Sequence, residues 1–214
     1  MPPVTNRELP TVFSRSAGWS ALFFALLFAS LAYAVEKWEE PAPFMYVERW
    51  LVDRSDYVAW VLTWGGYLNW LGPVCLMLLI VAYVRAEWRA RIIFGMLVLL
   101  AGWFASDSLQ HLLHRARRLD WFVKHETAFS FPSTHAVLAC TFYWLWAVYL
   151  WKTWWPKWAR IAGAILLLGL ALAICWSRLA LGAHYLTDIL GGIFLGLVLC
   201  YGCAAGGRRI GIRV

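Results

Sequence analysis

The sequence predicts an all-α fold: a polytopic membrane helix bundle with six transmembrane helices and both termini in the cytoplasm. Of its 214 residues, 62% are hydrophobic and only 14% are charged, a composition that excludes an ordinary soluble domain. The apolar residues gather in long runs, and a helix needs roughly 20 such residues to cross a bilayer. The alternating polarity of membrane β-barrel strands is absent from these runs. We therefore treat residues 1–214 as a single transmembrane domain.

The first apolar run follows a polar stretch, residues 1–16, which we expect to form a cytoplasmic tail. Ala32-Tyr33-Ala34 resembles a signal-peptide cleavage site, but the run is longer than the apolar core of a usual signal peptide, so we interpret it as an uncleaved anchor. The second run is unusually long and either begins as an interfacial helix or crosses at a tilt. The six predicted spans are 17–35, 58–84, 92–109, 133–151, 160–177 and 186–204.

Between the first two spans, residues 36–56 are rich in Glu and Trp and are interrupted by Pro41 and Pro43. We expect this outer segment to contain a helix that lies in the membrane interface, either as a lid or lateral gate or as a simple connector. Its apolar stripe would consist of Phe44, Tyr46, Val47, Trp50 and Leu51.

The distribution of basic residues predicts the orientation. Most of them fall on one side of the alternating spans, and the positive-inside rule places that side in the cytoplasm. Most of the net charge of +7 therefore reflects topology, and we predict no nucleic-acid partner. The basic residues on this side are Arg7, Arg15, Arg85, Arg89, Arg91, Lys152, Lys157, Arg160, Arg208, Arg209 and Arg213.

Three polar clusters interrupt the apolar pattern, and all of them fall on the opposite, outer side. The last contains Ser177, Arg178, His184 and Asp188. His184 and Asp188 are four residues apart, so on a helix they would share a face, and a carboxylate beside an imidazole fixes its tautomer and favours its charged form. Intramembrane Arg, His and Asp are rarely kept together without pairing or chemistry, although a helix end with a snorkelling Arg and a capping Asp is the alternative.

Upstream of it, Pro132-Ser133-Thr134-His135 opens the fourth span. Pro suits the first turn of a helix, and the amides of a helix start bind anions. Before it, the first cluster combines histidines with three arginines, which favours a phosphate ligand. A metal site built from His111, His114 and His135 is an alternative, although the neighbouring arginines would repel a cation. The first cluster contains Gln110, His111, His114, Arg115, Arg117 and Arg118.

Together, these clusters resemble the three motifs of the type 2 phosphatidic acid phosphatase (PAP2) family, over residues 110–188. The third motif, S-R-x5-H-x3-D, matches in full. The second, usually P-S-G-H, has Thr134 in place of Gly. The first, K-x6-R-P, keeps Arg117 but has Gln110 in place of Lys and Arg118 in place of Pro.

The resemblance implies a metal-independent lipid phosphatase without a cofactor. His184 would attack phosphorus to form a phosphohistidine, Asp188 would orient His184, and His135 would protonate the leaving group and then activate water. The phosphate would be bound by Arg117, Arg178, Ser133 and Thr134 together with Gln110, and Arg115 or Arg118 would replace the missing Lys charge.

The substrate implied by the resemblance is a lipid phosphate, presented among the membrane lipids at the outer face of the cytoplasmic (inner) membrane. Undecaprenyl diphosphate is narrowly favoured over phosphatidylglycerol phosphate, phosphatidic acid and lipid A phosphates. Three alternatives stay open: a phosphotransferase using the same His184, a non-catalytic transporter or lipid-binding protein, and a metal-dependent hydrolase. The sequence predicts no oligomeric state.

Overall fold

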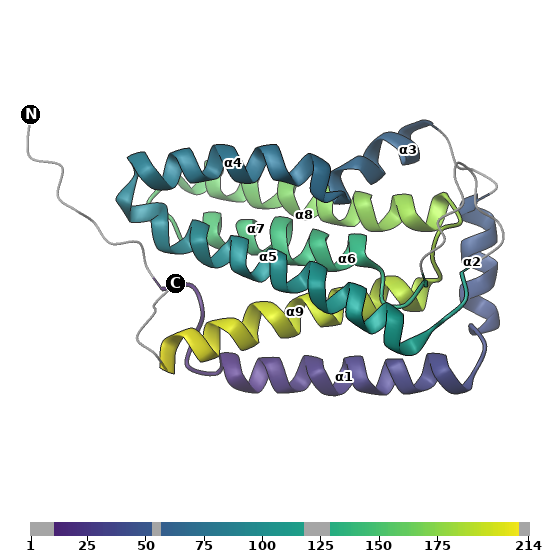
Figure 1. The fold of residues 1–214 in the computed structure, drawn as a ribbon. Coiled ribbons are helices and arrows are strands. Elements are labelled where there is room, and N and C mark those ends of the chain that lie inside the picture. The colour runs from purple at the N-terminus through teal and green to yellow at the C-terminus, as the bar shows by residue number, and fades with distance from the viewer. Residues whose placement is uncertain (1–10, 53–56, 118–128, 210–214) are drawn as a thin grey trace, which may run out of the picture.

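The computed structural model describes residues 11–52, 57–117 and 129–209, and within these ranges all regular secondary structure is helical (Figure 1). The helices are α1 (Ala17–Lys37), α2 (Ala42–Val52), α3 (Tyr57–Thr63), α4 (Leu68–Val84), α5 (Ala86–Leu113), α6 (Thr134–Ala139), α7 (Leu145–Trp151), α8 (Lys157–Ala180) and α9 (Leu186–Arg209). A 3₁₀ turn (Trp64–Gly66) joins α3 to α4, and a π-helical turn (Cys140–Trp144) joins α6 to α7.

Within the described residues, four helices are long and apolar enough to cross a membrane by themselves: α1, α5, α8 and α9. The long second run is broken. The segment Tyr57–Gly66 meets α4 at an angle of 51°. If this bent pair crosses the membrane as one unit, it is a fifth span. The break follows from Gly65 and Gly66, which weaken the helix, and from Tyr67, whose backbone is extended.

The remaining predicted span is helical from Thr134 to Trp151, but in the three consecutive pieces α6, the π turn and α7. The chain is thus a multi-pass membrane protein whose described residues form helices and no strands. The number of six spans and the cytoplasmic location of both termini stay predictions.

The order of the helices brings all three polar clusters to one end of the bundle. Figure 1 shows α5, α6 and α9 running side by side, α1 packed along α9, and α4 beside α5. The end of α5, the start of α6 and the α8–α9 loop meet at the end that α2 crosses. The α4–α5 corner and the α7–α8 loop, with their basic residues, lie at the other end.

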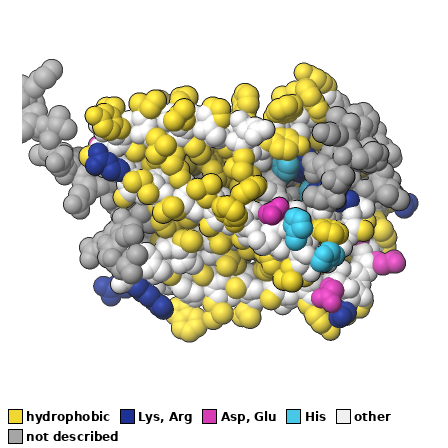
Figure 2. Space-filling model, viewed as in Figure 1, with side chains coloured by type: hydrophobic (Ala, Val, Ile, Leu, Met, Phe, Trp, Pro, Cys, Tyr) yellow, Lys and Arg dark blue, Asp and Glu magenta, His cyan; other side chains and the backbone are white. Residues whose placement is uncertain are grey.

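The outer surface is apolar, as expected for helices in contact with lipid. Figure 2 shows hydrophobic side chains across the middle of one face, whereas charged side chains gather toward its two ends. On α1, α4 and α8, large apolar side chains are more than half exposed, among them Leu26, Met77 and Leu166. Such extensive exposure would be unfavourable in water and is favourable in a bilayer.

The interior helices approach each other closely because α9 carries glycines where it crosses α6. A Cβ at Gly192 would lie 2.6 Å from the carbonyl oxygen of Ser133, and one at Gly196 would lie 2.6 Å from Cys140 Cβ. The four-residue spacing of these glycines places both on the contact face. This contact holds the start of α6, with His135, against the start of α9, with Asp188.

Candidate active site

His184 and Asp188 form the centre of the site. His184 lies in the α8–α9 loop and Asp188 in the first turn of α9, so the two do not share a helical face as expected from their spacing. A turn with Gly182 at φ 68° reverses the chain after α8 and brings the imidazole back over the helix start. His184 Nδ1 lies 3.3 Å from Asp188 Oδ2, which also accepts the Tyr185 amide at 2.9 Å. Both side chains are buried.

Arg117 determines the tautomer of His184. Its Nη1 lies 3.2 Å from His184 Nε2 and donates to the carbonyl of Ala183 at 3.1 Å. Because a guanidinium can only donate, Nε2 must accept, and the ring proton therefore sits on Nδ1 and points to Asp188. The lone pair of Nε2 thus faces the space where Arg117 would meet a bound anion.

The surroundings of His184 keep it neutral. Burial lowers its pKa most, the hydrogen bond to Asp188 raises it, and the positive charges of Arg117 and Arg178 lower it, to about 4. At neutral pH the imidazole is therefore unprotonated, which a nucleophile requires.

His135 reaches the same space from the first turn of α6. Its ring packs edge-on to Tyr67, with centroids 4.5 Å apart, and lies against Gly66, where a Cβ would be 2.4 Å from His135 Cδ2. The charges of Arg178, His184 and Arg117 all act on it. His135 Nε2 and Ser133 Oγ are buried and have no hydrogen-bond partner among the described residues, so both are available to a bound group.

Arg178 is fully buried at the end of α8. Its Nη1 donates to Thr63 Oγ1 at 2.8 Å, so the end of α3 helps to position the guanidinium. Thr63 was not expected from the sequence, because nothing in its local pattern indicates a contact 115 residues away. Ser177 donates to the carbonyl of Ile174 and serves the helix rather than the site.

Two of the three departures from the family motifs, Gln110 and Thr134, contact each other. Gln110 is buried near the end of α5, and its Nε2 donates to the carbonyl of Pro132 at 2.8 Å and to Thr134 Oγ1 at 3.1 Å. Both of its N–H groups are thus used within the protein, whereas we expected Gln110 to bind phosphate. The hydrogen bonds of Gln110 connect α5 to the start of α6. Pro132 was expected in the first turn of this helix, but it lies just before the helix begins.

Arg115 is also placed differently from our expectation. Its guanidinium donates to Asp188 Oδ1, to Thr187 Oγ1 at 2.7 Å, and to Glu40 Oε2 at 2.9 Å. Burial lowers its pKa, but the two carboxylates outweigh burial and raise it overall. Arg115 thus lies behind Asp188 and not beside the reactive face of His184. Arg118 lies outside the described residues.

Glu40, Glu48 and Thr187 complete this network, and sequence reasoning missed them. The one sequence feature that could have pointed to Glu40 and Glu48 is that they are acidic residues in the outer segment of a membrane protein. Acidic residues that become buried in such proteins usually have partners. Their partners lie more than 70 residues away, and no local pattern reveals them.

The metal alternative finds no support in this arrangement. His111 and His114 are exposed, whereas His135 is buried. In the described part of the chain, no group of three His, Cys, Asp or Glu residues is arranged to hold a metal ion.

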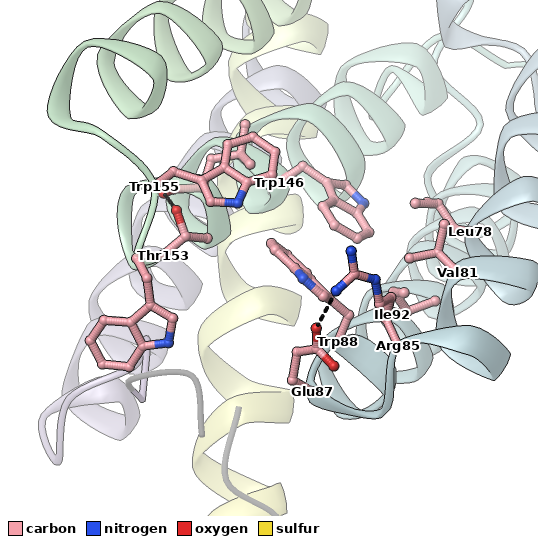
Figure 3. A pocket seen from close by; sticks show the side chains of 11 residues that line it. Leu78, Val81, Arg85, Glu87, Trp88, Ile92, Trp146, Thr153 and Trp155 are labelled. Carbon is pink, nitrogen blue, oxygen red and sulfur yellow. Dashed lines mark hydrogen bonds and ion pairs between the residues drawn. The ribbon is translucent and has the colours of Figure 1, made fainter. Parts of the chain in front are cut away.

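A cavity of about 410 Å³ opens at the other end of the bundle, between α4, α5 and α7. Figure 3 shows its lining of aliphatic and Trp side chains and the Arg85–Glu87 ion pair at 3.4 Å. It contains neither His184 nor His135, so it is separate from the candidate site.

Comparison with known proteins agrees with this geometry. The PAP2 superfamily model matches residues 103–210. The chain is 36% identical over 118 residues to phosphatidylglycerophosphatase B of Bacillus subtilis (strain 168), covering 50% of this chain and 55% of that protein. It is 35% identical over 79 residues to YbjG of Escherichia coli (strain K12), a candidate undecaprenyl-diphosphatase, covering 37% of this chain and 35% of that protein. The matched stretches thus span from about a third to about half of these relatives.

The fold agrees over a longer stretch. A crystal structure described as the first transmembrane PAP2-type phosphatidylglycerolphosphate phosphatase, from Bacillus subtilis, superposes with a TM-score of 0.74. The superposition covers 90% of this chain and 98% of that one, at 24% sequence identity. At this identity the likeness concerns the fold.

Proposed function

Because the chain belongs to the PAP2 superfamily, we propose that it is a membrane lipid phosphatase that hydrolyses a lipid phosphomonoester or diphosphate through a phosphohistidine on His184. The observation that carries the proposal is the polarity of the His184 ring. Nδ1 lies 3.3 Å from buried Asp188 and Nε2 lies 3.2 Å from Arg117, while Arg178 and His135 are close enough to interact with the ring electrostatically. This arrangement offers a neutral nucleophile next to two guanidinium groups, as phosphoryl transfer requires.

In the proposed reaction, phosphate oxygens replace Nε2 as the partner of Arg117 and also bind Arg178 and Ser133 Oγ. Nε2 attacks phosphorus, the bond to the leaving oxygen breaks, and that oxygen takes a proton from His135. The bound phosphate favours the protonated form of His135 before this step. Asp188 stabilises the positive imidazole ring of the intermediate. His135 then takes a proton from water, the water oxygen attacks phosphorus, and free phosphate leaves His184.

The protein residues supply all the positive charge in this scheme, so we propose that no metal or cofactor takes part. We also propose that the site faces the periplasm or cell exterior. The basic residues at the end with the α4–α5 and α7–α8 loops support this orientation through the positive-inside rule. A substrate with its phosphate at that interface would be amphiphilic, and undecaprenyl diphosphate and phosphatidylglycerol phosphate are suggested by the names of the relatives.

The test is phosphate release by the detergent-purified protein, with EDTA present, from undecaprenyl diphosphate, phosphatidylglycerol phosphate, phosphatidic acid and lipid A. We expect release from at least one lipid and its loss in His184→Ala. Release that requires added divalent metal would contradict metal independence. Absence of release from every lipid would contradict hydrolysis, and phosphate transfer to an added acceptor lipid would then identify a phosphotransferase.

A further inference from the structure

Helix α2 crosses the site end of the bundle and turns two carboxylates inward. Glu40 precedes the helix and Glu48 lies on its inner face, with exposed fractions of 6% and 0%. On the outer face, Tyr46 is 73% and Trp50 47% exposed. Burying a carboxylate is costly unless it is paired or hydrogen-bonded. The partners of these two side chains therefore indicate what the carboxylates hold in place.

Both carboxylates hold the first turn of α9. Glu48 Oε1 accepts the amide of Leu186 at 2.6 Å, and Glu40 Oε1 accepts the amide of Thr187 at 3.2 Å. Glu40 Oε2 also accepts the hydroxyl of Thr187. The first amides of a helix lack partners within the helix, and its N-terminus attracts negative charge. Two carboxylates from α2 therefore fix the turn that carries Asp188.

Arg115 extends this contact to the reacting group. It donates through Nη2 to Glu40 and through Nη1 to Asp188, and its guanidinium lies over the Tyr185 ring at 4.3 Å from the centroid. Asp188 in turn accepts from His184. The side chains of Glu40, Arg115, Asp188 and His184 thus form one continuous chain of contacts from the start of α2 to the imidazole.

We propose that Glu40 is a positioning residue for the proposed phosphatase reaction, and that α2 is a fixed support of the catalytic loop instead of a lid that opens. Glu40 neutralises part of the positive charge of Arg115, which also pairs with Asp188. Asp188 therefore keeps enough negative charge, and the right orientation, to stabilise the positive ring of His184 in the phosphohistidine. The inference rests on the proposed function, because it concerns the group that forms that intermediate.

The effect on His184 can be separated from a general loss of structure. Among the described residues, the charged or titratable groups that act on its ring are Asp188, Arg117, Arg178 and His135. Without Glu40, Asp188 would be the one carboxylate among the described residues that pairs with Arg115. His184 would then be less easily protonated and its phosphorylated form less stable. The rate of the chemical step should fall, while the groups proposed to bind substrate stay in place.

The experiment compares Glu40→Gln with Glu39→Gln in the purified full chain. Glu39 is exposed and adjacent, so its variant makes the same charge change away from the network. Using the lipid from which the wild type releases phosphate, we expect kcat of Glu40→Gln to fall roughly ten- to a hundredfold, the range seen when the supporting partners of metal-bound histidines are removed. KM should stay within about threefold of the wild-type value. The acid limb, which is the fall of kcat/KM at low pH, should move to lower pH. Glu39→Gln should match the wild type in all three.

A folded Glu40→Gln protein with wild-type kcat and acid limb would overturn the inference, and so would a raised KM with unchanged kcat, which would place Glu40 in substrate binding. If Glu40→Gln does not fold, Glu40→Asp decides: its shortened side chain should lower kcat without moving the acid limb, and wild-type kcat would overturn the inference. A wild type that shows no His184-dependent phosphate release overturns the proposed function as well, whereas an active wild type with an unaffected Glu40→Gln overturns only the role of Glu40.

Discussion

Among single residues, His184 should determine how activity depends on pH. Its pKa is lowered to about 4, mainly by burial, and only the neutral ring can attack phosphorus. We therefore expect kcat/KM of the wild type to lose activity on the acid side only near pH 4, below the ordinary range of histidine. The measurement is kcat/KM against pH in the detergent-purified enzyme. A loss of activity near pH 6.5 with a diphosphate and a monoester substrate alike would contradict this expectation.

The same shift should appear in stability. Above pH 6.5, His184 is neutral in both the folded and the unfolded chain and has no linkage effect. Below that pH, the unfolded chain binds a proton that the folded chain does not, so stability should fall as the pH drops from 6.5 to 4, by roughly 3 kcal/mol in total. Melting temperatures of wild type and His184→Gln across this range test this, and parallel curves would contradict it.

Gly66 should control the position of His135. An added methyl group would lie 2.4 Å from His135 Cδ2, so Gly66→Ala must displace the imidazole. Displacing a catalytic group by about 1 Å can cost about a hundredfold in rate, and we expect a fall of that order in kcat. Gly72→Ala is the matched control, because a Cβ there meets nothing within 4 Å. Equal activity of the two variants would exclude His135 from the chemistry.

Gln110 and Thr134 should behave as a coupled pair. Their hydrogen bond at 3.1 Å predicts that Gln110→Leu and Thr134→Val destabilise the protein non-additively, with a coupling energy of about 1 kcal/mol. A double-mutant cycle of unfolding free energies measures it. Additive effects would mean that the side chains of Gln110 and Thr134 are not energetically coupled.

Among the helices, the contact of α9 with α6 should tolerate no larger side chain. A Cβ at Gly192 meets a backbone carbonyl, which cannot rotate away, so Gly192→Ala should destabilise the protein by about 3 kcal/mol and shift Ser133. Gly206→Ala, in the same helix but with open space around it, serves as the control. Thermal unfolding in detergent distinguishes them, and equal melting temperatures would show that α6 and α9 can move apart.

The helices themselves could largely be predicted from the sequence, because runs of apolar residues and polar interruptions are local features. The run 58–84 was the exception: its apolar character continues through Gly65 and Gly66, and hydropathy does not register a bend. Likewise, motif spacing was enough to propose His184, Asp188 and His135 as site residues, and the structure places His184 beside Asp188. The contacts of Thr63, Glu40 and Glu48 could not be predicted, because they depend on how distant helices pack.

For the whole molecule, the orientation in the membrane is the property to test. In a background without the native cysteines, Ser16→Cys would mark the end with the basic loops and His114→Cys the site end; both positions are exposed. Because basic loops stay in the cytoplasm, a membrane-impermeant maleimide added to intact cells should label only His114→Cys. After permeabilisation both should react, which controls for accessibility. Labelling of Ser16→Cys alone would place the site in the cytoplasm.

The packing of α1 along α9 also bears on how the protein is made. Phe24 of α1 stacks on Tyr201 of α9 at 5.9 Å, so the first and last described helices are neighbours (Figure 1). During translation, α1 emerges from the ribosome long before α9. It must therefore remain in the bilayer without its final neighbour while the intervening helices are inserted. The bundle can close around the α8–α9 loop only after α9 has been inserted, so we expect a translation product that ends before α9 to stay open and inactive in the membrane.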